Sequence, residues 1–210
     1  MDICCLIPKE IENLDLLRYL SISSGARHVI PADSICNLWN LETLDMRNSK
    51  IECLPKGIWK LQKLRHFYLD GPTSLPITDN EAALPNLQVL TVLGSLTNLR
   101  ILKVVGCANV KLDCNESSFC QLEVFKTVKV TDMIWNMKKG AMPRLQHLVI
   151  ERCNFFVIPL DELCCLSALR DVEVLHPDPK LADMLQQLQM RDGCKLQVNP
   201  PLASGPISNN

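Results

Sequence analysis

Apolar residues recur along the chain in one short pattern: a leucine, two residues, an apolar residue, one residue, and a second apolar residue. Copies of the pattern start at Leu17, Leu41, Leu64, Leu87, Leu99, Leu122, Leu145 and Leu169. The successive first leucines are 24, 23, 23, 12, 23, 23 and 24 residues apart. Chance apolar triplets do not keep such a period, so we interpret the chain as about seven to eight repeats. The spacing of 12 marks an irregular junction over residues 87–104.

Each copy of the pattern predicts a β-strand. The last two apolar residues are two positions apart, which places them on the same side of a strand. In the copy that begins at Leu122, Thr127 takes the last apolar place. The residues between the apolar positions are predicted to project from the opposite side of the sheet.

A second element precedes several of the predicted strands. Apolar residues three apart, a spacing typical of a short helical or 3₁₀ turn, occur at Ile11 and Leu14, Ile35 and Leu38, and Ile58 and Leu61. The extended segments before such turns end at Pro8, Pro31, Pro55 and Pro159. Trp39 and Trp59 fall in these turns, where we expect them to pack.

A single repeat buries too little surface to fold alone. Burying about five aliphatic side chains contributes roughly 8 to 15 kcal/mol, whereas ordering about 23 residues costs roughly 23 to 45 kcal/mol of backbone entropy. Stacking buries both faces of every repeat. The sequence therefore predicts an α/β solenoid, curved, with parallel strands on its concave face and short helical or 3₁₀ turns on its convex face.

The pattern ends after Leu175, and a different one follows. Leu181, Met184, Leu185 and Leu188 share one face of a helix, which predicts an amphipathic helix. We expect repeats over residues 1–178, a C-terminal capping helix over 179–198 and a disordered tail over 199–210.

Composition narrows the function. Aromatic residues make up 5% of the 210 residues against 47% hydrophobic residues, so the core is supplied mainly by Leu, Ile and Val. With 22 basic and 23 acidic residues the net charge is −1, which argues against general binding to nucleic acid or to membrane surfaces. No apolar run approaches the roughly 18 residues of a membrane-spanning helix, and the N-terminus lacks the pattern of a signal peptide.

The chain has 11 cysteines, an odd number, scattered without a secretory signal, which indicates reduced thiols. Cys107 and Cys153 stand at the ninth position of their repeats, where this class of repeat places Asn or Cys pointing into the turn. Cys107, Cys114 and Cys120 lack the paired spacing of a zinc site. We expect no metal and no cofactor.

The run from Leu41 to Leu69 reads LETLDMRNSKIECLPKGIWKLQKLRHFYL. It resembles the leucine-rich repeats of the coiled-coil class of plant nucleotide-binding (NB-ARC) disease-resistance proteins, which are intracellular immune receptors. The later runs that begin at Ala141 and Leu163 are similar in style, and the resemblance is weakest over residues 105–140. The coiled-coil and nucleotide-binding domains of that family are not expected here, and because no G-x-x-x-x-G-K-[ST] motif occurs, the nucleotide switch is not carried over.

The resemblance implies a protein-interaction module in plant defence, in the cytoplasm or the nucleus. Its partners would be pathogen effectors, host proteins that effectors modify, or the receptor's own nucleotide-binding domain, which it would restrain. No nucleic acid partner and no membrane insertion are expected. Two alternatives stay open, a general signalling scaffold of the small-GTPase-binding type and a truncated, non-functional receptor fragment.

Solenoids of this kind bind partners through side chains that project from the strands of the concave face. The candidate partner-binding residues are Arg18, Tyr19, Glu42, Asp45, Arg65, His66, Tyr68, Val89, Arg100, Ile101, Lys103, Lys126, His147 and Arg170. The polar residues at the two ends of this face flank an apolar centre formed by Val89, Ile101 and Val124. Such a surface is able to seat a partner.

Catalysis is the remaining class of function to consider. His66 and His147 share a strand position but are several repeats apart, which argues against joint acid–base or metal chemistry. A thiol enzyme would need a cysteine of depressed pKa. No G-x-S-x-G, H-E-x-x-H or phosphate-binding motif occurs. We therefore expect no enzymatic activity and no catalytic residues.

Overall fold

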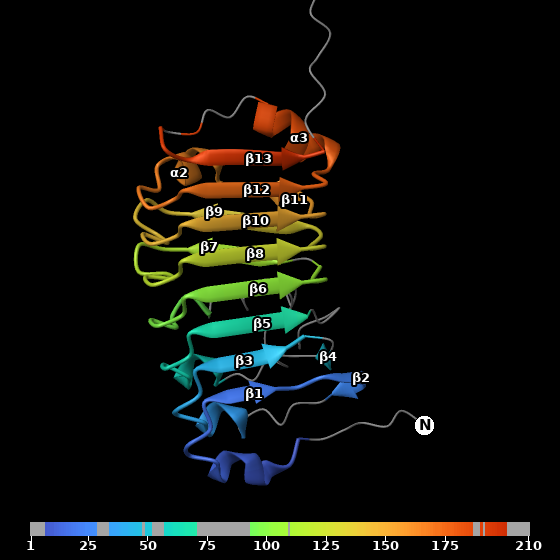
Figure 1. The fold of residues 1–210 in the computed structure, drawn as a ribbon, viewed down its shortest axis with the longest axis vertical. Coiled ribbons are helices and arrows are strands. Elements are labelled where there is room, and N and C mark those ends of the chain that lie inside the picture. The colour runs from blue at the N-terminus through green and yellow to red at the C-terminus, as the bar shows by residue number, and fades with distance from the viewer. Residues whose placement is uncertain are drawn as a thin grey trace, which may run out of the picture.

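A computed structural model of the chain describes residues 7–28, 34–47, 49–51, 57–70, 93–108, 110–186, 190 and 192–200. Its main layer is an eight-stranded sheet in which the strands follow one another in chain order along the long axis (Figure 1). The strands are β1 (Tyr19–Ser21), β3 (Thr43–Met46), β5 (His66–Asp70), β6 (Ile101–Val105), β8 (Val124–Val128), β10 (His147–Glu151), β12 (Asp171–Leu175) and β13 (Lys195–Asn199). Every neighbouring pair is parallel, as predicted.

Side chains alternate across this sheet with the predicted period of two. In β5, β6, β8, β10 and β12 the burial runs half-buried, buried, half-buried, buried, half-buried. The buried positions are the fourth and sixth of each repeat, such as Phe67 and Leu69. Thr127, which breaks the apolar pattern, is also buried, and its hydroxyl donates a hydrogen bond to the Val149 carbonyl at 3.5 Å.

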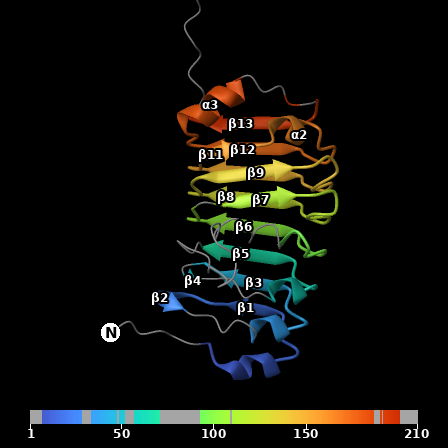
Figure 2. The ribbon, with the colours of Figure 1, turned by 180° about the vertical axis from the view of Figure 1, so that it is seen from behind.

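The opposite layer differs between the two halves of the molecule (Figure 2). In the N-terminal half it contains 3₁₀ helices η1 (Lys9–Asn13), η2 (Ile35–Asn37) and η3 (Ile58–Lys60), which confirms the predicted turns. Two short strands, β2 (Ser24–His28) and β4 (Ser49–Ile51), pair in parallel beside them.

In the C-terminal half, the opposite layer is a second parallel sheet, which the sequence analysis did not predict. It contains β7 (Lys111–Cys114), β9 (Met133–Met137) and β11 (Phe155–Val157), in the order β11-β9-β7. Helix α2 (Leu160–Cys164) follows β11. The reason lies in the sequence of β9, where Met133, Trp135 and Met137 alternate with more exposed residues and so favour a strand over a helical turn.

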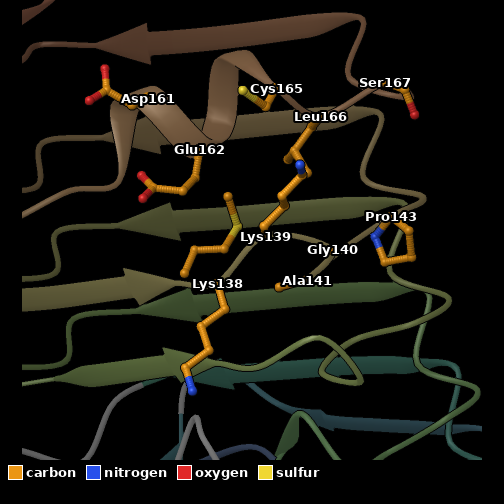
Figure 3. Close-up of a pocket in the computed structure, with 11 residues that line it drawn as sticks. Lys138, Lys139, Gly140, Ala141, Pro143, Asp161, Glu162, Cys165, Leu166 and Ser167 are labelled. Atoms are coloured by element: carbon orange, nitrogen blue, oxygen red, sulfur yellow. The ribbon is translucent and has the colours of Figure 1, made fainter.

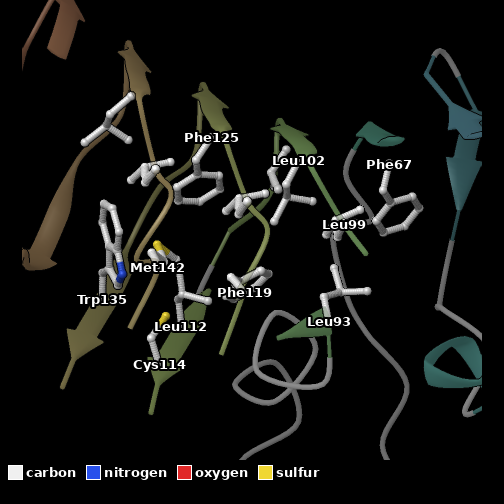
Figure 4. Packing of buried hydrophobic residues seen from close by; sticks show 14 of the residues in the cluster. Phe67, Leu93, Leu99, Leu102, Leu112, Cys114, Phe119, Phe125, Trp135 and Met142 are labelled. Carbon is white, nitrogen blue, oxygen red and sulfur yellow. The ribbon is translucent and has the colours of Figure 1, made fainter. Parts of the chain in front are cut away.

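The core fills the space between the two layers (Figure 4). Phe125 of β8 and Trp135 of β9 meet edge to face, with ring centroids 5.4 Å apart at 88°. Both side chains are fully buried. The pair joins the two sheets, and aromatic contacts of this geometry add roughly 0.5 to 1.5 kcal/mol beyond the burial of area.

The main sheet continues without a gap from β5 to β6, on either side of the irregular junction. β5 pairs directly with β6, with His66 opposite Ile101, although 35 residues separate them against the usual 23 or 24. The sequence also predicts a strand in the copy at residues 87–92. That copy, including Val89, lies outside the described residues.

The predicted C-terminal cap is wrong in its second half. Helix α3 spans Pro179–Gln186, and the chain then returns to the main sheet as β13. Lys195 pairs with Asp171 of β12, 24 residues earlier, so one more repeat continues the period. Gly193 takes the place of the first leucine, which hid this repeat from the leucine pattern. Residues 201–210, predicted to be disordered, lie outside the described residues.

A left-handed backbone residue follows each of the main-sheet strands β6, β8, β10 and β12. Gly106, Lys129, Arg152 and His176 occupy the eighth position of their repeats, with φ of 64°, 51°, 50° and 50°. The backbone N–H of Lys129 donates to Glu151 at 2.7 Å, and that of Arg152 donates to Leu175 at 2.8 Å. The turn therefore extends the hydrogen-bond ladder by one residue, at the cost of a conformation that disfavours any side chain.

Candidate protein-binding face

The side of the main sheet that faces away from the core is the surface for which binding was predicted. We call it the front face, formed by the third, fifth and seventh residues of each repeat, counted from the first leucine; it faces the viewer in Figure 1. The strands bring together the predicted residues Tyr19, Asp45, His66, Tyr68, Ile101, Lys103, Lys126 and His147. These residues are now neighbours in register, for example Tyr68 opposite Lys103.

The predicted residues at the second position form a separate row, where the strands begin. They are Arg18, Glu42, Arg65, Arg100 and Arg170. Glu42 lies 3.8 Å from both Arg18 and Arg65, and Arg100 lies 3.8 Å from Glu123. These ion pairs are solvent-exposed, so each contributes roughly 0 to 1 kcal/mol at most. Since two arginines share one glutamate, the row keeps guanidinium donors available to a partner.

Asp45 differs from the other predicted residues because it is buried, with 5% of its surface exposed. The Nε and Nη2 atoms and the backbone N–H of Arg47 all donate to its carboxylate. These bonds hold the pKa of Asp45 below its ordinary value, mainly through the side-chain hydrogen bond from Arg47. Asp45 therefore positions Arg47, whose guanidinium lies 4.8 Å from the ring centroid of Tyr68, and is not an open contact for a partner.

The two histidines of the front face have separate partners. His66 Nδ1 lies 3.1 Å from Thr43 Oγ1, and His147 Nδ1 lies 3.0 Å from Asp171 Oδ2. In the sheet, β6 and β8 stand between their strands. The structure thus agrees with the expectation that His66 and His147 do not act together.

The seventh position of the repeat was missed, because the predicted strands ended at the sixth. Val105, Val128 and Glu151 occupy it on β6, β8 and β10, in register with one another. The signal was present, since an apolar residue recurs there in two successive repeats. Ile101 and Val124 at the third position and Val105 and Val128 at the seventh position make the centre of the front face apolar at both positions.

A sequence profile described as a leucine-rich repeat region matches residues 4–92. Late blight resistance protein R1-A of Solanum demissum is 39% identical over 95 residues, which cover 41% of this chain and 7% of the relative. ToMV susceptible protein tm-2 of Solanum lycopersicum is 37% identical over 60 residues, covering 29% of this chain and 7% of the relative. The chain is thus similar, over part of its length, to a leucine-rich repeat region and to plant resistance proteins.

A longer match extends the similarity along most of the chain. Putative late blight resistance protein homolog R1B-11 of Solanum demissum is 27% identical over 201 residues, covering 82% of the chain and 15% of the relative. The chain thus spans only a small part of the length of these curated relatives.

Two solved structures align with most of the chain. The repeat domain of the type III effector XopL superposes with a TM-score of 0.48 at 17% identity, covering 93% of this chain and 73% of the other. The plant peptide hormone receptor RGFR1, in complex with RGF2, gives 0.49 at 17% identity, covering 92% and 34%.

The exposure of two tryptophans corrects an expectation. Trp39 and Trp59 were predicted to pack in the turns of the leucine-rich repeats, but 58% and 49% of their surfaces are exposed. The buried residues of these turns are instead Ile35, Cys36 and Leu38 in the first and Ile58 and Leu61 in the second. The tryptophans therefore offer aromatic surface to solvent in the segments that precede β3 and β5.

A hollow of about 490 Å³ lies between two successive repeats on the other side of the solenoid (Figure 3). Its apolar lining comes from Met137, Ala141 and Leu166. Lys138 and Lys139 stand on one rim, whereas Asp161 and Glu162 of α2 stand on the other. The volume is in the range of ligand pockets, so the hollow is a second place able to seat an apolar side chain.

The cysteines of the repeats are mostly structural. Cys153 donates to the Glu151 carbonyl at 3.3 Å and accepts a hydrogen bond from the Val130 N–H at 3.4 Å, as expected for a ninth-position residue inside the turn. Burial raises the pKa of both Cys107 and Cys114 to about 12. Cys165 is exposed in the hollow.

Two absences concern only the part of the chain that the structure describes. It holds no group of three or more His, Cys, Asp or Glu residues arranged to bind a metal ion. Its helices are all too short or too polar to cross a membrane.

Proposed function

We propose that this leucine-rich-repeat protein is a non-catalytic recognition module of plant disease resistance, acting inside the cell, and that it binds a protein partner through the front face. The partner is a pathogen effector or a host protein that an effector has modified. The family resemblance adds a second partner, a receptor nucleotide-binding domain that the module would restrain.

One observation carries the proposal. Eight strands line up side chains of differing chemistry on one face, and on β5, β6, β8, β10 and β12 those side chains are half-exposed. Arginines gather along the edge where the strands begin, and aliphatic residues gather at the centre. A rigid face with an apolar centre and a polar margin has the anatomy of a protein interface.

The relatives support the choice of partner class. Their names describe late blight resistance and susceptibility to ToMV. Candidate partners are therefore effectors of the late blight pathogen and proteins of ToMV, and both sets belong in a binding panel.

The test is pairwise binding between the purified whole chain and each panel protein, measured by surface plasmon resonance. Arg65→Glu and Arg100→Glu reverse charges on the margin of the front face, and we expect each to weaken a genuine complex about tenfold or more. Arg144→Glu is the matched control, because Arg144 is an exposed arginine in the turn before β10.

Circular dichroism must first show that all three variants fold like the parent chain. A partner whose affinity falls only with Arg144→Glu would place the binding surface elsewhere and overturn the proposal for the front face. A partner that binds all variants equally would do the same.

A further inference from the structure

Two lysines lie side by side at the centre of the front face. Lys103 of β6 and Lys126 of β8 are direct register partners on adjacent parallel strands, and both are half-buried. Neighbouring strands are only about 4.8 Å apart. Like charges that face each other across strands destabilise a sheet, so the arrangement is unfavourable unless an anion lies between the two ammonium groups.

Aliphatic side chains enclose the lysine pair on both sides along the strands. Ile101 and Val124 pair in register two residues before the lysines, and Val105 and Val128 pair two residues after them. We call these six residues the lysine patch: Ile101, Lys103, Val105, Val124, Lys126 and Val128. Its centre is positive and its two ends are apolar.

The chain itself only partly neutralises the patch. Lys126 Nζ lies 3.5 Å from Glu151 Oε2, but the other carboxylate oxygen of Glu151 also faces Arg152 at 3.7 Å. Lys103 forms no ion pair with any residue that the structure describes. Asp45 feels its charge only at longer range, since its carboxylate is taken by Arg47.

We infer that the lysine patch binds one carboxylate of an acidic side chain that is flanked by aliphatic residues in an extended segment of the protein partner. The inference deepens the proposed function and rests on it. A carboxylate placed between the two Nζ atoms accepts a charge-assisted hydrogen bond from each and removes their repulsion. The flanking aliphatic residues exclude water from the pair once the segment is bound, which strengthens those bonds.

The spacing of the patch sets the pattern of the segment. Ile101, Lys103 and Val105 alternate along one strand, so they stand about 6.6 Å apart on the same face. An extended segment that runs along the strands presents its own alternate side chains at the same spacing. An aliphatic, an acidic and an aliphatic residue at alternate positions therefore match the patch, and burying the two aliphatic ends adds hydrophobic stabilisation.

The test uses the whole chain and a defined probe, the blocked peptide acetyl-Ser-Val-Thr-Glu-Thr-Val-Ser-amide. Lysines are reductively methylated with ¹³C and followed by NMR, with assignments from Lys103→Arg and Lys126→Arg. We expect the two resonances to shift on titration. We also expect affinity to fall about tenfold when Gln replaces the Glu of the peptide, and to fall as salt rises.

Protein variants provide the matched comparison. Lys103→Gln and Lys126→Gln should abolish the preference for Glu over Gln, whereas Lys138→Gln, at an exposed lysine on the rim of the hollow, should preserve it. Lys103→Gln should also raise the urea midpoint of the free chain, because it removes the repulsion, and Lys138→Gln should not.

Several outcomes overturn the inference. One is equal binding of the Glu and Gln peptides, and another is no movement of the Lys103 and Lys126 resonances. Tighter binding of a phosphoserine peptide by tenfold or more would reassign the patch to phosphate. If these arms fail while a panel partner still loses affinity with Arg65→Glu and Arg100→Glu, the proposed function stands and only the lysine patch is wrong.

Discussion

The carboxylate of Asp45 is held by Arg47, two residues further along the same chain. The guanidinium Nε lies 2.9 Å from Oδ1, and the backbone N–H of Arg47 donates to the same oxygen at 3.1 Å. Asp45 is nearly buried, while Arg47 lies over the ring of Tyr68. Asp45, which was predicted to contact a partner, thus holds the side chain of Arg47 in place on the front face instead.

Asp45→Asn should lower the free energy of unfolding by about 1 to 3 kcal/mol, because a neutral amide loses the charge-assisted bonds to Arg47. Urea unfolding followed by circular dichroism measures the change. Asp161→Asn, at an exposed carboxylate on the rim of the hollow, is the control and should change stability little. Equal effects of the two substitutions would contradict a structural role for Asp45.

Stability should also depend on pH through Asp45. Its pKa in the folded chain is lowered from 3.8, so its contribution is fully present above about pH 3.8. That contribution is lost as the pH falls below 3.8 towards the folded pKa. Unfolding midpoints of the parent chain should therefore fall more steeply with acid than those of Asp45→Asn, and parallel curves would contradict the prediction.

The left-handed residues at the strand ends predict gains in stability. Lys129→Gly and Arg152→Gly should each stabilise the chain by up to about 1 kcal/mol, because the relief of roughly 1 to 2 kcal/mol of left-handed strain exceeds the entropy cost of glycine. Lys138→Gly serves as the comparison, since Lys138 does not have positive φ, and it should destabilise. A loss at all three positions in thermal melts would refute the account.

Substitutions at two adjacent residues of β13 should have different effects on stability. Leu196 of β13 is half-buried against the core, whereas Gln197 is exposed. Leu196→Asp should cost about 1 to 3 kcal/mol by placing a charge against apolar side chains, and Gln197→Asp should be nearly neutral. If both variants keep the parent stability, β13 does not close the end of the solenoid.

Thiol chemistry predicts an order of labelling. In the native chain, N-ethylmaleimide should modify the exposed Cys165 rapidly and leave Cys107 and Cys114 unmodified, because burial hides them and raises the pKa of each to about 12. Peptide mass spectrometry at short times gives the order, and urea should equalise the rates. Fast labelling of Cys107 or Cys114 would reopen the thiol-enzyme alternative.

The leucine pattern correctly predicted the repeated strands and the 3₁₀ turns of the first three repeats. It failed where a residue other than leucine occupies the first position of a repeat, and where a strand replaces the expected turn. Gly193 fills the place of a leucine before β13, and β9 alternates apolar residues where a turn was expected. In both cases neighbouring repeats supply the hydrogen bonds and the burial, and a pattern based on one residue type does not register that contribution.

By itself, the sequence determined the period, the parallel solenoid and the side of each strand that turns outward, because alternation and spacing are local properties of the chain. Only the tertiary structure decided which outward residues are available. It buried Asp45 under Arg47, placed Lys103 beside Lys126, and brought β5 against β6 across 35 residues. The burial of a side chain and the pairing of a strand depend on which repeats lie next to each other. Only the stacking of the repeats in the folded chain determines those neighbours.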